Sequence, residues 1–229
     1  MPPPVADTDF IYQMAARTRA SRIVELRGNN RGSMVGAFVA WLNGGWQTLV
    51  FESRHELKIA YILLAKSGLQ DLFDQPPRVR FIGLDGEVHA HTFDFLAVIN
   101  GRRYAVAAKF RSSAERLHFR RQLAVIKSQC SDFADEVLLV TEEDFTKEDA
   151  LAAELFHFIG RENDPEADAL VGKIVSTLTG SATVGSIVAA SGLKSRAWRS
   201  IVRLVGLNQV NVVGTARIDD YDTCIIRAT

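Results

Sequence analysis

Cysteine is scarce in this chain of 229 residues, and long hydrophobic runs are missing. Cys130 and Cys224 are too few for a disulfide framework or a four-ligand zinc site. No apolar run approaches the ~20 residues of a membrane span, and the start, MPPPVADTDF, lacks the basic head and apolar stretch of a secretory signal. We therefore expect a cytoplasmic protein with no membrane partner.

Common catalytic motifs are also missing, since the chain has no Gly-rich phosphate loop, HExxH, GxSxG or CxxC. His89 and His91 lie two residues apart and could bind a metal together, although partly exposed strand residues would give the same pattern. The chain does contain 47% hydrophobic and 24% charged residues. That composition is typical of a globular protein with a core large enough to need no disulfides.

The charges are balanced overall but arranged in blocks. Lys plus Arg and Asp plus Glu number 27 each. Residues 17–31 carry five Arg and one Glu, residues 102–127 carry eight basic groups and one acid, and residues 132–149 carry eight acids and one Lys. Solvated helix faces would explain any one block. Three basic blocks together, with 194–203 as the third, favour a polyanionic partner such as double-stranded DNA.

Periodicity and turn residues divide the chain into three regions. Residues 1–45 are predicted to form a basic N-terminal arm, and residues 46–160 an α/β domain with a mixed sheet. Asp85-Gly86 and Asn100-Gly101 predict tight hairpin turns. After a strand at 46–53, the order is helix, three strands, helix, strand and helix: 53–66, 78–84, 88–99, 102–110, 112–127, 136–144 and 147–158.

The third region, residues 165–229, is predicted to be a small winged helix-turn-helix domain. Its first helix is expected at 167–178, its second in TVGSIVAASGL with Thr183 as the N-cap, and its third at 195–204 with Ser195 as the N-cap. The segments QVNVVG and TCIIRA are expected to form a hairpin after these helices. The last helix carries the predicted DNA-binding residues Lys194, Arg196, Arg199 and Arg203. We expect Arg196 or Arg199 to contact bases and Arg203 to contact phosphate. A small helical protein-interaction domain is the alternative to a winged helix, and docking of this face on the preceding α/β domain or on a partner protein is the alternative to DNA binding.

Asp94 and Lys109 are the strongest candidates for chemistry. Asp94 lies in an apolar strand, where a carboxylate needs a partner or a metal, and Lys109 ends the next strand after a tight turn. The hairpin should bring the two side chains together. Metal-assisted phosphodiester hydrolysis uses such a pair, because the carboxylate binds Mg²⁺ and the lysine orients water. A purely structural Asp–Lys pair is the alternative.

This arrangement resembles the PD-(D/E)xK restriction-endonuclease-like superfamily, and within it the TnsA-type transposon endonucleases. FESRHELKIAYILL, LQDLFDQPPRVRF and HTFDFLAV carry the resemblance over roughly residues 45–145, and the C-terminal domain looks like that family's winged helix. The resemblance implies a mixed sheet flanked by helices and Mg²⁺- or Mn²⁺-dependent cleavage of one DNA strand at mobile-element ends, with a separate transposase as partner. It places Glu56, Asp94 and the carbonyl of Ala108 on the metal, and Lys109 beside the attacking water.

Two positions depart from a simple match. Ala107 stands where the family has Glu, Asp or Gln, and a methyl group cannot bind a metal. The chain is then an engineered inactive variant, or a nuclease that takes a ligand from Glu115 or Gln122, or a natural non-catalytic DNA-binding or assembly scaffold. Glu56 also completes a capping box with Ser53, which would explain it without a metal. A phage or plasmid protein-interaction module is a third class, supported by the acidic block.

Overall fold

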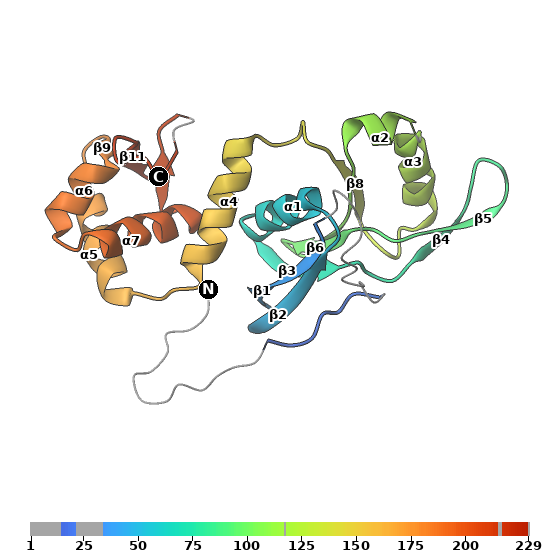
Figure 1. Ribbon diagram of the computed structural model, residues 1–229, viewed down its shortest axis with the longest axis horizontal. Coiled ribbons are helices and arrows are strands. Elements are labelled where there is room, and N and C mark those ends of the chain that lie inside the picture. The colour runs from blue at the N-terminus through green and yellow to red at the C-terminus, as the bar shows by residue number, and fades with distance from the viewer. Residues whose placement is uncertain (1–14, 22–33, 117, 215–216, 229) are drawn as a thin grey trace. The chain divides into compact units, whose positions relative to one another are not determined.

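The computed structural model describes residues 15–21, 34–116, 118–214 and 217–228 (Figure 1). The chain is mixed α/β, as predicted, and the described residues form seven helices. It divides into two compact units, an N-terminal unit that ends at Thr146 and a C-terminal unit that begins at Lys147. Within the described ranges, every helix is too short or too polar to traverse a bilayer.

A mixed four-stranded sheet is the centre of the N-terminal unit. Its strand order is β3-β6-β7-β8, with β7 parallel to β8 and the other neighbours antiparallel. The bounds of these strands are Leu69–Asp74 for β3, Phe95–Ile99 for β6, Arg102–Ala108 for β7 and Glu136–Val140 for β8. The antiparallel β6–β7 turn has positive φ at Asn100 and Gly101, as the Asn-Gly pair predicts.

Helices cover both faces of this sheet. Successive residues of β7 alternate between the faces, as in any strand. Val106 and Ala108 belong to the core formed with α1 (Arg54–Leu64), whereas Ala105 and Ala107 belong to the core formed with α3 (Phe119–Gln129). The last residues of β7 are therefore packed on both sides, which holds the end of this strand in place.

The predicted N-terminal arm is wrong over its last residues, because β1 (Gly36–Leu42) forms a hairpin with β2 (Gly45–Phe51). The turn has positive φ at Asn43 (48°) and Gly44 (79°), the conformation that suits a two-residue hairpin. Arg19 also packs on the N-terminal unit through a double hydrogen bond to Asp71. Residues 1–14 and 22–33 of the predicted arm lie outside the described residues.

Two predicted segments are divided in the structure. The strand expected at 88–99 becomes β5 (Val88–His91) and β6, because β5 pairs with β4 (Val79–Ile82) in a separate hairpin while β6 joins the main sheet. The helix expected at 112–127 becomes α2 (Arg111–Arg116) and α3, because His118 has a left-handed φ of 48°. Strand β3 was not predicted, because no element was expected between the helix at 53–66 and the strand at 78–84.

The C-terminal unit contains four helices and a small antiparallel sheet of order β10-β11-β9. The bounds are Lys147–Gly160 for α4, Pro165–Ser176 for α5, Ala182–Thr183 for β9, Val184–Ser191 for α6, Ser195–Gly206 for α7, Val210–Val212 for β10 and Cys224–Arg227 for β11. Thr183 caps α6 by accepting a hydrogen bond from Ser186 N, as predicted. Val171, Ile187 and Ile201 join α5, α6 and α7 in one core.

The predicted domain boundary at 160–165 differs from the division in the structure, because α4 belongs to the C-terminal unit. Ile159 is buried in the core of that unit, and Phe156 packs against it. Phe156 also lies beside Gly206 at the end of α7, because a Cβ built on Gly206 would be in van der Waals contact with the Phe156 ring at 3.5 Å. The apolar side of α4 is thus used within the C-terminal unit.

Candidate functional site

Asp94 lies in the short break between β5 and β6, where the chain changes sheets. Its backbone is held from both sides, because Asp94 N donates to Val106 O at 3.0 Å and Gln75 N donates to Asp94 O at 2.9 Å. Its carboxylate oxygen Oδ2 accepts a hydrogen bond from Ala108 N at 2.7 Å. The carboxylate is therefore fixed at the end of β7, one residue before Lys109.

Three charged side chains act on this carboxyl group. Burial, together with the negative charge of Glu56 and the smaller effect of Glu52, raises the pKa of Asp94 to about 6, against the opposing effects of the Ala108 N–H and of Lys109. The structure thus brings Asp94, Glu56 and Lys109 into one electrostatic neighbourhood, as the sequence analysis predicted. A raised carboxyl pKa produced by burial and neighbouring carboxylates is typical of functional sites.

Glu52 is the member of this cluster that the sequence analysis missed. It follows β2 directly and precedes the N-cap of α1, so it reaches the same end of the sheet as Glu56. The signal was present in the sequence, because FESRHE places two glutamates around the predicted helix start. Only the glutamate of the capping box was considered there.

Glu56 has the structural role that its spacing from Ser53 predicts. Glu56 N donates to Ser53 Oγ at 3.1 Å, while Glu56 Oε2 accepts from Glu52 N at 2.8 Å. Ser53 Oγ also donates to Glu56 Oε1 at 2.9 Å. The capping box is complete, and it points the Glu56 carboxylate towards the start of α1, where the helix dipole favours a negative charge.

Two variants separate capping from charge at this helix start. We expect Ser53→Ala to lower the free energy of unfolding by about 1 kcal/mol, because Glu56 N loses its acceptor. Glu56→Gln keeps an oxygen that can accept from Glu52 N and should leave stability within about 0.5 kcal/mol of the parent. Urea unfolding followed by circular dichroism measures both. A larger loss for Glu56→Gln than for Ser53→Ala would show that the charge itself stabilises the fold.

The structure supplies no metal ligand at position 107, where the resembling family has Glu, Asp or Gln. Ala107 is fully buried and its methyl group belongs to the α3-side core with Phe93 and Phe119. Of the two substitutes considered from the sequence, Glu115 is exposed and pairs with Arg111 at 2.7 Å, and Gln122 lines a cleft beside α3. Glu52 is instead the additional carboxylate whose charge acts on Asp94.

A divalent cation fits this cluster in charge but not in ligand number. The charges of Glu56 and Glu52 act on Asp94 against the single positive charge of Lys109, which leaves negative charge that a cation would offset. Among the described residues, however, no group of three His, Cys, Asp or Glu side chains is gathered closely enough to hold a metal ion. Asp94 and Glu56, with the carbonyl of Ala108, are the groups that would bind an ion here.

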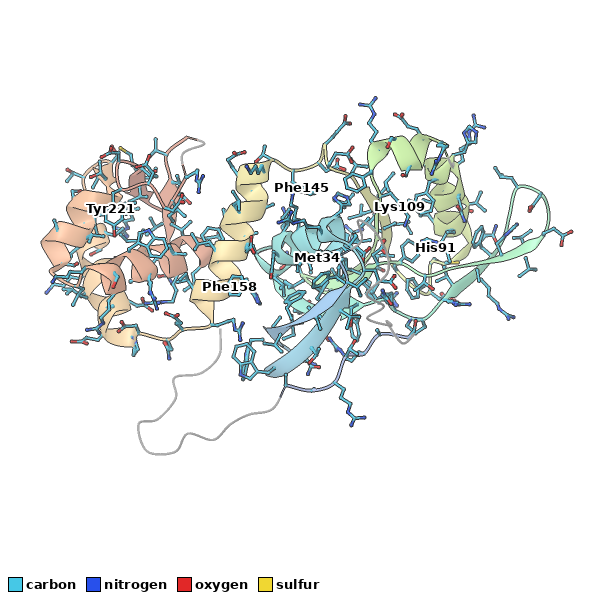
Figure 2. The ribbon with its side chains drawn as sticks, in the orientation of Figure 1. Met34, His91, Lys109, Phe145, Phe158 and Tyr221 are labelled. Atoms are coloured by element: carbon cyan, nitrogen blue, oxygen red, sulfur yellow. The ribbon has the colours of Figure 1, made fainter. Side chains whose placement is uncertain are left out.

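His91 lies on the α3 side of this site, next to Lys109 (Figure 2). Lys109 Nζ is 5.9 Å from the ring centroid of Phe119, and the His91 ring is 5.4 Å from the same ring. Burial and the charge of Lys109 lower the pKa of His91 to about 4, and its Nε2 finds no hydrogen-bond partner among the residues that the structure describes. His89 pairs instead with Asp85 at 2.9 Å, so the two histidines do not form a shared metal site.

The arginines of α7 are all paired with acids of their own unit. Arg196 binds Asp164 at 2.7 Å and Glu166 at 2.6 Å. Arg199 pairs with Glu162. The guanidinium of Arg203 makes three hydrogen bonds of 2.6 to 3.0 Å to the carboxylate of Asp168, and its side chain is only 1% exposed.

These pairs correct the predicted DNA-binding helix. Arg203 cannot contact phosphate in this structure, because its side chain is buried and bound to Asp168. The arginines of the face that was expected to enter DNA are paired instead with acids of α5 and of the segment before it, within the same unit, and neither alternative considered from the sequence included this pairing. Ser195 is also not the N-cap, since Lys194 occupies that position with a φ of 53° and no side-chain hydrogen bond. Lys194 itself is exposed.

Comparison with known proteins does not assign the chain to a family. The chain matches no protein-family model, and a search of curated proteins found no match.

Proposed function

We propose that this protein is a metal-dependent DNA endonuclease of the TnsA type, which cuts DNA at mobile-element ends together with a separate transposase. The observation that carries the proposal is the carboxyl group of Asp94, whose pKa is raised beside Glu56 and whose oxygen is fixed one residue from Lys109. Glu56 is explained by its capping box, whereas burial of the Asp94 carboxylate near a second negative charge is unfavourable for folding, and carboxyl groups perturbed in this way cluster at functional sites.

The topology supports the same proposal. The order α1, β3, β6, β7, α3 and β8, with β8 parallel to β7, agrees with a restriction-endonuclease-like core. In the C-terminal unit, the order α5, β9, α6, α7 is followed by the β10–β11 hairpin, and this order agrees with a winged helix. The endonuclease activity and the transposase partner come from the sequence resemblance.

The chemistry expected at the site is hydrolysis of a phosphodiester. Mg²⁺ or Mn²⁺ would supply a hydroxide at neutral pH and offset charge on the phosphate, but the described residues do not gather three acidic, histidine or cysteine side chains to hold it, so a further ligand would be needed. Asp94 is kept in position by Ala108 N, and Lys109 provides the positive charge that can orient a water or a phosphate oxygen beside it. The apolar residues around Ala107 exclude water from the α3 side of the strand end.

A non-catalytic DNA-binding or assembly scaffold is the second candidate, and Ala107 is the observation that favours it. The methyl group at this position is 0% exposed and offers no ligand, and Glu56 is already used in the capping box. A protein of this kind would keep the nuclease-like core for its shape and its surface. The two candidates differ in whether a carboxylate at position 107 creates cleavage.

Nicking of supercoiled plasmid in Mn²⁺ tests the proposal. We expect Ala107→Glu and Ala107→Gln to nick at least about tenfold faster than the parent chain, because each adds a metal ligand. Asp94→Asn in the Ala107→Glu chain should remove the gain. Since position 107 is fully buried, circular dichroism must show that each variant is folded. Folded Ala107 variants that bind DNA and leave the plasmid intact would favour the scaffold.

A further inference from the structure

Cations without acidic partners gather on the N-terminal unit, along α2 and α3. Over the described part of the chain, Arg116, Arg120 and Arg121 form no ion pair, and all three are exposed. The arginines of α7 show the opposite arrangement, because each is bound by a carboxylate. A phosphate group would have to displace an acid on α7, whereas no acid has to leave on α3.

A cleft of about 400 Å³ lies between α3 and the β4–β5 hairpin. Arg121 and His118, from the start of α3, line one wall, and Phe81 and His89 of the hairpin line the other. The two walls are held together by the amide of Gln129, which accepts from Ile82 N at 2.8 Å and donates to Ile82 O at 3.0 Å. The cleft is therefore formed before any ligand binds.

The cleft is lined by one acid that is already hydrogen-bonded and by one arginine that is not paired in the described part of the chain. Asp85 is the only acid among its lining residues, and the carboxylate of Asp85 is bound by His89 Nε2 and by Glu87 N. Arg121 has no such partner within the described residues. His118 precedes α3 with a φ of 48°, and its ring makes no capping hydrogen bond to the helix.

The cleft also adjoins the candidate active site. Phe119, the first residue of α3, packs beneath Lys109 and beside His91. The residues on either side of Phe119 therefore connect the cleft to the side of the sheet where Lys109 and Asp94 lie. A phosphate chain bound along α3 would reach both places without leaving the N-terminal unit.

We infer that the cleft between α3 and the β4–β5 hairpin binds the sugar–phosphate backbone of duplex DNA through Arg121 and His118, and that the arginine face of α7 does not. This inference rests on the proposed function, because it takes DNA as the ligand. The match is one of charge and shape. Free guanidinium and imidazole groups at a preformed cleft suit phosphate oxygens.

A pair of matched charge-removing variants tests the location. Fluorescence anisotropy with a labelled DNA duplex, over a series of salt concentrations, compares the parent with Arg121→Gln and with Arg199→Gln. We expect Arg121→Gln to weaken binding about five- to tenfold at 0.1 M salt and to lower the salt slope by roughly one. His118→Asn/Arg121→Gln should weaken binding further, and asparagine tolerates the positive φ at position 118. Arg199→Gln should leave binding within about twofold, because its charge is already paired with Glu162.

Each other outcome decides against the inference in a distinguishable way. Equal losses of DNA affinity for Arg121→Gln and Arg199→Gln would mean that only net charge matters. A larger loss of affinity for Arg199→Gln would show that DNA binds to α7. Either result overturns the cleft and leaves the proposed function standing. A parent chain that binds no duplex at any salt concentration would overturn the proposed function and the cleft together. Circular dichroism of each variant confirms that a loss of binding is not a loss of fold.

Discussion

Arg203→Ala is expected to lower the free energy of unfolding of the C-terminal unit by about 3 kcal/mol, because removing one partner of a buried ion pair leaves the charge of the other without compensation. The Arg203 side chain is 1% exposed and makes three hydrogen bonds to Asp168, which is itself 21% exposed. Deleting the guanidinium also leaves a cavity at the centre of α7. Urea unfolding measures the change, with Trp198 as the only tryptophan in a Trp41→Phe/Trp46→Phe background.

Arg199→Ala is the matched control on the same helix. Its pair with Glu162 is 45% and 49% exposed on the two sides, so we expect a change below about 1 kcal/mol. The double variant Arg203→Met/Asp168→Leu should recover part of the loss, since both charges are removed together. Equal destabilisation by Arg203→Ala and Arg199→Ala would contradict the burial of the Arg203–Asp168 pair.

Asp94→Asn is expected to stabilise the metal-free protein at pH 7.5 by about 2 kcal/mol. The pKa of Asp94 is raised to about 6 in the folded chain, so the folded state binds more protons than the unfolded state between about pH 4 and 6. Stability from this group is therefore complete below pH 4 and is lost as the pH rises through 6. Asparagine can still accept from Ala108 N and carries no charge, so it avoids this loss.

The difference between Asp94→Asn and the parent should accordingly disappear by pH 4, where the parent carboxyl is protonated. His91, whose pKa is lowered to about 4, weakens both chains equally on acidification and cancels in the comparison. At pH 7.5, Mg²⁺ or Mn²⁺ should stabilise the parent by about 2–3 kcal/mol at a hundredfold excess over its Kd, and Asp94→Asn not at all. An Asn variant less stable than the parent at pH 7.5 would show that the carboxylate is structural. An unchanged metal response would place the ion elsewhere.

Local sequence chemistry accounts for the features that depend on neighbouring residues. The Asn100-Gly101 turn, the Thr183 cap of α6 and the Ser53–Glu56 capping box are all present as predicted. Each is determined within about four residues, because turns and caps are closed by hydrogen bonds between near neighbours. The same logic would have predicted the Asn43-Gly44 hairpin, which the arginine-rich composition of the preceding segment concealed.

Elements that depend on distant partners were predicted less well. The segment 88–99 has an uninterrupted strand pattern, yet it divides before β6 because its two halves pair with different strands. The first half, β5, pairs with β4, and the second half, β6, pairs with β3 and β7 in the main sheet. Likewise, periodicity predicts the length and type of α4 but not the unit whose core receives Phe156 and Ile159. A hydrophobic stripe indicates that a helix is packed, and only the tertiary structure shows on what.

The sequence by itself determined the mixed α/β class and the proximity of Asp94 and Lys109, since Asp94 directly precedes β6, Lys109 directly follows β7, and one hairpin joins these two strands. Only the tertiary structure decided the state of the basic residues. The spacing of Arg196, Arg199 and Arg203 places them on one face of α7, but the acids that neutralise that face lie more than 25 residues earlier in the chain. Arg121 has the same side-chain chemistry and no such partner within the described residues. Whether an arginine is available to a phosphate depends on what folds against it, and sequence spacing carries no information about contacts over that distance.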